Sequence, residues 1–199
     1  MKRILLFLSS FIIVVSAAAV LYMAAFPSGK FYVQAALGNS NAQFQLGHIL
    51  ASDDKKRSEA IYWLEKAAAQ NHASVQLDLA RLTFLGEGVE KSETQGAAWV
   101  RKAAENGLSR AQALLGVLYL GGIGVDQNFD EALKQFNRSQ EKEAQALKEK
   151  VQQVQDQLNN LPPEQRDAQQ KILYENTAAD VRKSFMDILD EVKQPQNTE

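Results

Sequence analysis

The sequence predicts an all-α protein: a short α-solenoid of about three helix-turn-helix repeats, with one transmembrane helix before it and a long helical hairpin after it. Three observations predict this architecture. One segment recurs at an offset of 36 residues, as from Trp63 to Trp99, and such a period is typical of stacked helical hairpins. An apolar run opens the chain, and two segments near its end carry apolar residues in steps of three and four.

The repeat is visible in three separate marks that share the same offset: residues 63–68 recur as 99–104, residues 79–80 as 115–116, and residues 86–89 as 122–125. Each unit is expected to be a helix A, a loop and a helix B. Glycines end helix A, because they adopt backbone angles that other residues avoid. Glycine within helix A costs about 1 kcal/mol relative to alanine, so close approach of a neighbouring helix is expected there. Trp63 and Trp99 are expected to fill the space between hairpins.

This pattern resembles the Sel-one-like repeats, which are short relatives of the tetratricopeptide repeats. The resemblance runs from Gly38 to about Gln140, and the third repeat departs from it at Gln135-Phe136, near the tryptophan position. It implies stacked hairpins that bind protein partners. The positions that carry the motif are Leu46, Gly47, Trp63, Leu79, Gly86, Gly88, Trp99, Leu115, Gly116, Tyr119, Gly122 and Gly124.

Composition excludes several classes of function. The net charge is −2, and the sequence has no run of Lys and Arg such as a nucleic-acid surface needs. The absence of cysteine excludes disulfides, zinc–thiolate sites and cysteine nucleophiles. His48 and His72 have no second ligand at metal-binding spacing. We therefore expect a protein that is not an enzyme, with no catalytic residue, no metal and no cofactor.

The N-terminal segment predicts a membrane anchor. Lys2 and Arg3 precede an apolar run from Ile4 to Phe26, and a helix of about 23 residues reaches about 35 Å, enough for a hydrocarbon core of about 30 Å. A cleaved signal peptide is the main alternative, although its apolar region is normally about 7–15 residues. A buried core helix is a third reading. The basic residues before the run favour a cytoplasmic N-terminus. Family resemblance then suggests a bacterial inner membrane, with the rest of the chain in the periplasm.

The C-terminal segment predicts a long hairpin. The third helix B is expected to continue unbroken from Asp130 to about Leu158, and Pro162-Pro163 to end it and begin a second helix. Apolar residues in both helices suggest that each buries the other. This hairpin either caps the last repeat or pairs with another chain. The predicted domains are an anchor at 1–29, the repeats at 30–140, the hairpin at 141–194 and a disordered tail at 195–199.

A partner-binding face is predicted from spacing along helix A. In related repeats one stripe of helix A lines a concave groove, and two arginines on this stripe suit a peptide that carries carboxylates. An ordinary solvated face is the alternative. The residues on the stripe are Asn41, His48, Ser74, Arg81, Arg110 and Val117.

Together these features predict a membrane-tethered adaptor or scaffold for protein–protein interactions in the cell envelope. Its expected partners are envelope or membrane proteins and, through the N-terminal helix, the lipid bilayer, with no nucleic acid. A structural subunit of a larger membrane complex is one alternative. A secreted soluble binding protein is another, if the N-terminus is cleaved.

Overall fold

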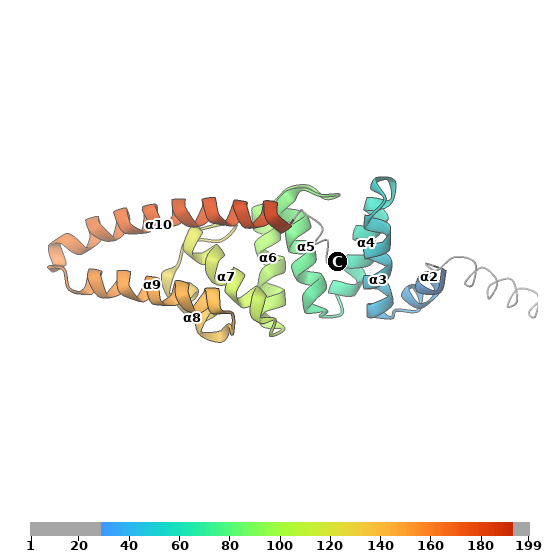
Figure 1. The fold of residues 1–199 in the computed structure, drawn as a ribbon, viewed down its shortest axis with the longest axis horizontal. Coiled ribbons are helices and arrows are strands. Elements are labelled where there is room, and N and C mark those ends of the chain that lie inside the picture. The colour runs from blue at the N-terminus through green and yellow to red at the C-terminus, as the bar shows by residue number, and fades with distance from the viewer. Residues whose placement is uncertain (1–28, 193–199) are drawn as a thin grey trace, which may run out of the picture. The chain divides into compact units, whose positions relative to one another are not determined.

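The computed structural model of this protein describes residues 29–192 (Figure 1). The apolar run at 4–26 and the tail at 195–199 lie outside the described residues. Within 29–192, no helix has both the length and the apolar character needed to cross a membrane. The prediction of an anchor at the N-terminus therefore stays a prediction.

Between residues 29 and 192 the regular structure is entirely helical, which confirms the all-α class. The elements in chain order are α2 (Gly29–Ala36), α3 (Ser40–Ala51), the short 3-10 helix η1 (Asp54–Lys56), α4 (Arg57–Ala68), α5 (Ala73–Leu85), α6 (Glu93–Glu105), α7 (Ser109–Gly121), α8 (Phe129–Arg138), α9 (Lys142–Asn159) and α10 (Pro163–Val192).

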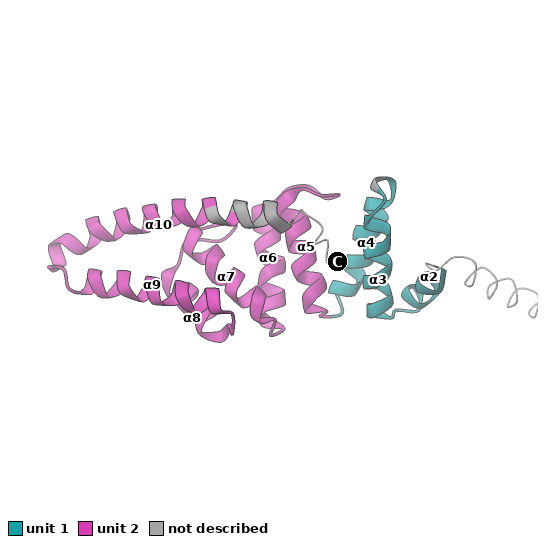
Figure 2. Cartoon of the chain, viewed as in Figure 1, with its two compact units in different colours: residues 1–70 teal, residues 71–199 magenta. Residues whose placement is uncertain are grey.

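The chain forms two compact units, coloured separately in Figure 2. The first covers residues 1–70 and holds α2, α3, η1 and α4; the second covers residues 71–199 and holds α5 to α10. The division falls after the first repeat. The domain boundaries expected from the sequence stay predictions.

The first unit is one helical hairpin with an extra helix packed against it. Helices α3 and α4 pair, and α2 packs on α3. Asn39 caps α3 by accepting a hydrogen bond from the backbone N–H of Ala42 at 2.9 Å. Gly47 is required where the two helices meet, because a Cβ there would lie 2.7 Å from Leu64 Cγ. This contact explains why glycine is placed inside α3.

The second unit contains two more hairpins, α5–α6 and α7–α8, with α6 packed against α7. The A helices α5 and α7 end at Gly86 and Gly122, whose φ values of 73° and 59° are left-handed, as the glycine motif predicts. The B helices α6 and α8 begin after Ser92 and Asn128, which cap them through their side chains.

The residue that fills each hairpin interior is the one after the tryptophan position. Leu64, Val100 and Phe136 are 2%, 0% and 0% exposed. Trp63 and Trp99 are only half-buried and pack at the edge of the core, and Lys102 Nζ lies 4.2 Å from the centroid of the Trp99 ring. The tryptophans therefore cover the core, and the main filling comes from their neighbours.

Buried glutamines form a second recurring feature of the repeats. Gln43 Nε2 donates to the carbonyl of Ala35 at 3.0 Å, and Gln112 Nε2 donates to the carbonyl of Ala104 at 3.2 Å. Both side chains are buried, and each satisfies a carbonyl at the end of the preceding helix. These bonds tie α3 to α2 in the first unit and α7 to α6 in the second.

The prediction of an unbroken helix from Asp130 to Leu158 is wrong. Helix α8 ends at Arg138, Ser139 is extended, and α9 begins at Lys142. Ser139 Oγ donates to the carbonyl of Ser109 at 3.1 Å, and Gln145 Nε2 donates to the carbonyl of Phe136 at 3.0 Å. Side chains thus replace the lost helical hydrogen bonds. No glycine or proline marks this break in the sequence, and one of the hydrogen bonds that stabilise it joins Ser139 to the distant Ser109.

Helix α9 ends at Asn159 and α10 begins at Pro163, as the two prolines predict. Arg166 holds the turn: its Nε donates to the carbonyl of Leu161 at 2.8 Å, and its Nη2 donates to the carbonyl of Asn159 at 2.9 Å. The guanidinium therefore satisfies carbonyls at the end of α9.

From Tyr174 onward, α10 packs on the repeats of the second unit. Tyr174 stacks on Phe129 with ring centroids 3.7 Å apart, and Phe185 meets the Phe84 ring edge-on at 5.1 Å. Arg182 donates to the carbonyls of Gly121 at 3.0 Å and Gly122 at 2.7 Å, at the C-terminus of α7. Of the two arrangements considered for the hairpin, contact with the repeats is the one observed.

Candidate functional site

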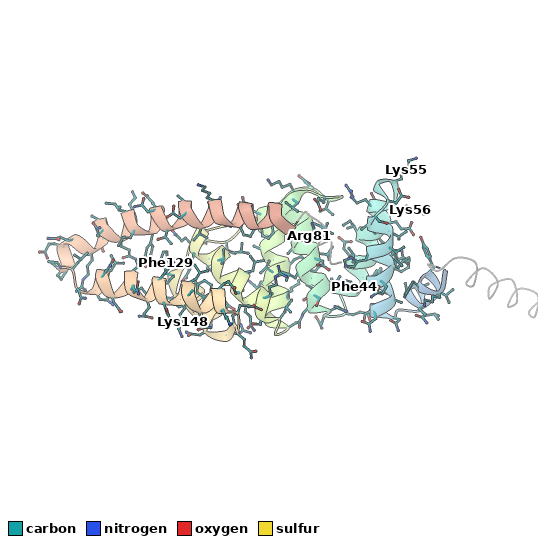
Figure 3. All side chains as sticks on the ribbon, in the orientation of Figure 1. Phe44, Lys55, Lys56, Arg81, Phe129 and Lys148 are labelled. Atoms are coloured by element: carbon teal, nitrogen blue, oxygen red, sulfur yellow. The ribbon has the colours of Figure 1, made fainter. Side chains whose placement is uncertain are left out.

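Three of the six predicted binding residues come together in the second unit. Arg81 on α5 (labelled in Figure 3) and Arg110 and Val117 on α7 line one cleft. Ser74 is exposed on α5 and is not among the residues that line it. Asn41 and His48 are exposed on α3 of the first unit. A binding role for these residues stays a prediction.

The cleft lies between the A helices of the repeats and the two helices of the C-terminal hairpin. One part has a volume of about 430 Å³ and is lined by α5, α7, the start of α9 and Phe185 of α10. A second part of about 380 Å³ lies between α9 and α10 and shares Val117, Leu147 and Phe185 with the first. We call the two parts together the arm cleft. Its main apolar lining residues are Leu77, Phe84, Leu114, Val117, Leu147 and Phe185.

The apolar side chains that line the cleft remain partly accessible to solvent. Leu77, Leu114, Val117 and Leu147 are each half-buried, although they face a space between helices. No buried side-chain nitrogen or oxygen in the described part of the chain lacks a hydrogen-bond partner. The cleft therefore offers apolar contact area, and the buried polar side-chain atoms around it already have hydrogen-bond partners.

Its charges differ from those expected from the sequence. Arg81 Nη1 is ion-paired with Glu87 Oε2 at 3.0 Å, so this arginine is already engaged. Asp78, Glu141 and Glu143 line the same space as Arg110. The sequence argument for a carboxylate-bearing peptide counted only the arginines of helix A. It omitted the acidic residues that α9 brings to the cleft.

A second hollow, of about 790 Å³, lies beside the glycine loop of the third repeat. It is lined mainly by polar groups, including Glu93, Arg101, Tyr119 and Glu131. Among residues 29–192, no group of three or more His, Asp or Glu side chains lies close enough to hold a metal ion. The arrangement gives no catalytic or metal-binding chemistry to assign to this hollow.

Sequence reasoning missed the contribution of the C-terminal hairpin. Leu147 and Phe185 belong to the apolar pattern that was expected to join α9 to α10. In the structure both residues also face the repeats. The apolar spacing was visible in the sequence. The same spacing suits packing of α9 and α10 against each other or against the repeats.

Comparison with known proteins identifies the repeats. The family model described as Sel1 repeat matches residues 40–72, 73–108 and 109–136. A crystal structure of a Sel1 repeat protein from Oxalobacter formigenes is 30% identical, with a TM-score of 0.56, and the match covers 61% of this chain and 96% of that chain. A protective antigen of uropathogenic Escherichia coli strains with an SLR fold is 25% identical, with a TM-score of 0.54, over 91% of this chain and 40% of that chain.

Two curated relatives are regulators by name. The chain is 29% identical over 117 residues to chitin synthase regulator SKT5 of Saccharomyces cerevisiae, which covers 55% of this chain and 17% of the relative. It is 34% identical over 112 residues to chitin synthase regulatory factor 3 of Schizosaccharomyces pombe, which covers 52% of this chain and 12% of the relative. The chain thus spans less than a fifth of the length of either relative.

Proposed function

Because this chain belongs to the Sel1 repeat family, whose members mediate protein–protein interactions, we propose that it is a non-enzymatic, membrane-tethered adaptor of the cell envelope. The adaptor binds a protein partner through the second unit and holds it near the membrane. Tethering raises the effective concentration of the repeats for partners in the same membrane.

The observation that carries this proposal is the arm cleft. Half-buried apolar side chains from α5, α7 and α9 surround a space that the described residues leave open. Contiguous apolar surface that remains accessible is typical of sites for protein partners. A cleft with this apolar lining suits binding of a partner better than catalysis.

The curated relatives support a regulatory form of this role. Both are named as regulators or regulatory factors of an enzyme, and they match about half of this chain. By analogy, the adaptor would control the activity or location of its partner rather than act on a substrate.

The tether rests on the sequence. The apolar run from Ile4 to Phe26 is long enough to span a bilayer, and Lys2 and Arg3 before it favour an N-terminus in the cytoplasm. In this proposal the anchor lies in a bacterial inner membrane and the repeats lie in the periplasm.

Fractionation combined with cross-linking of the full chain in its host cells tests the proposal. We expect the intact chain to stay with membranes in high salt, to leave them in mild detergent, and to capture one protein reproducibly. The matched control replaces residues 1–26 with a cleavable signal peptide, which should abolish membrane retention and preserve capture. A full chain that is released by salt would contradict the tether, and failure to capture any protein would contradict the adaptor role.

A further inference from the structure

We propose that the arm cleft binds an amphipathic α-helix of a partner protein, with basic residues beside its apolar stripe. This inference rests on the proposed adaptor function and specifies the partner of that site. It depends on three features of the second unit: the apolar lining of the cleft, the helices that form its walls, and the distribution of charge along it.

The lining favours a helix over an extended peptide. Each residue of an extended peptide brings a backbone N–H and C=O that must find a partner when they are buried. Most of the described residues that line the cleft lie in helices, and the backbone groups inside a helix are bonded within it; no sheet edge lies beside these residues. A helix satisfies its own backbone and presents only side chains, so it can enter such a cleft without this cost.

The arrangement of the walls also fits a helix. Helices α9 and α10 diverge from their shared turn, and the repeats close the space between them (Figure 1). Val117, Leu147 and Phe185 line both parts of the cleft, so its apolar floor is continuous. An inserted helix would pack its apolar side against α7 and α9, which is the usual mode of helix-in-groove recognition.

The charges select a basic partner. Glu141, Glu143 and Asp180 line the cleft together with Arg110 and Lys150, while Arg81 is already paired with Glu87. When the paired Arg81 is not counted, these residues are three acidic and two basic, so the cleft carries an excess of negative charge. Complementary charge steers association and discriminates against an acidic partner.

The test measures binding of two labelled synthetic helical peptides to the full chain in detergent by fluorescence anisotropy. Both peptides carry the same leucine pattern; one has lysines and the other has glutamates at every polar position. We expect the leucine–lysine peptide to bind at least tenfold more tightly. Equal affinity for the two peptides would contradict the charge argument, and no binding of either would overturn the helix site.

Variants locate the peptide. Val117→Glu and Leu147→Glu place a carboxylate on the apolar floor, and each is expected to weaken binding of the leucine–lysine peptide at least tenfold. Ile172→Glu is the matched control, because Ile172 is 51% exposed on α10 and does not line the cleft; it should change the affinity less than twofold. Similar losses in all three variants would place the peptide elsewhere. Circular dichroism melting confirms that each variant is folded.

Reversing the charge of two residues at the cleft tests its preference for a basic helix without changing the apolar floor. The double variant Glu141→Lys, Glu143→Lys should reduce the preference for the leucine–lysine peptide at least fivefold. The exposed pair Glu149→Lys, Glu164→Lys adds the same charge outside the cleft and should leave the preference within twofold. An equal effect of the two double variants would show attraction by overall charge only and would overturn the assignment.

The proposal fails separately from the adaptor function. If Val117→Glu leaves capture of the cellular partner unchanged, the adaptor function stands and the cleft is not its site. If Val117→Glu instead abolishes a concentration-dependent dimer of the chain in analytical ultracentrifugation, the occupant is a second copy, and the assignment to a partner helix is wrong.

Discussion

Replacing Gly124 with alanine is expected to destabilise the second unit by about 2–5 kcal/mol. Gly124 has a φ of +66°, which costs an L-residue about 1–2 kcal/mol. A Cβ at this position would also overlap the backbone carbonyl of Glu93 at the start of α6 and would lie 2.9 Å from the amide nitrogen of Thr94. A backbone carbonyl cannot rotate away as a flexible side chain can, so the loop or α6 must move.

Gly107 provides the matched control for this substitution. Its φ is +85°, but a Cβ there would meet nothing within 4 Å. Gly107→Ala should therefore cost only the backbone term of about 1–2 kcal/mol. Urea unfolding, monitored by the fluorescence of Trp99 in a Trp63→Phe background, measures the loss of stability of the second unit in both variants. Equal losses in the two variants would show that close approach to Glu93 is unimportant.

Replacing Phe136 with alanine is expected to cost about 3–5 kcal/mol, the range observed for large aromatic residues truncated in a core. Phe136 is 0% exposed, and its ring lies where a Cβ of residue 116 would otherwise be, with Cδ1 2.7 Å from that position. Truncation leaves a cavity between α7 and α8 that the backbone of Gly116 cannot fill.

The same unfolding measurement checks this prediction. Ile172→Ala is the control, because a substitution at this exposed position should change stability by less than about 0.5 kcal/mol. The contact can be tested further by combining Gly116→Ala with Phe136→Leu. The smaller side chain should relieve part of the overlap, so the double variant should lose less than the sum of the single losses. Strict additivity, or a loss below about 1 kcal/mol for Phe136→Ala, would argue against the packing of this hairpin.

Local signals explain what the sequence could predict. Gly86, Gly122 and Gly124 have left-handed backbone angles, which favour glycine whatever the neighbouring helices are. Because this preference depends only on the residue's own backbone, the repeated glycines could be recognised from the sequence. The role of Phe136 could have been found by the same offset, since it lies 36 residues after Val100, which lies 36 after Leu64. The repeat motif is defined by the tryptophan position, and these residues follow that position directly.

Long-range contacts explain what the sequence could not predict. The break at Ser139 depends on Ser109, and the path of α10 depends on Arg182 reaching the carbonyls of Gly121 and Gly122. Apolar residues spaced by three and four show that a helix has an apolar face, but they do not show which neighbour covers it. For the candidate site, the stripe on helix A was readable, whereas the walls contributed by α9 and α10 were not.

The most direct test of this account is whether α10 is bound to α7 of its own chain, because the arm cleft exists only in that arrangement. A Cβ at Gly121 would lie 3.1 Å from Val181 Cγ1, so Gly121→Cys with Val181→Cys places two thiols at disulfide distance in a chain that has no other cysteine. Mild oxidation of the dilute protein should give a disulfide within the monomer, while Gly121→Cys with Ile172→Cys should not. Absence of this disulfide, or its formation only between chains, would contradict the fold-back of α10 and the cleft that it forms.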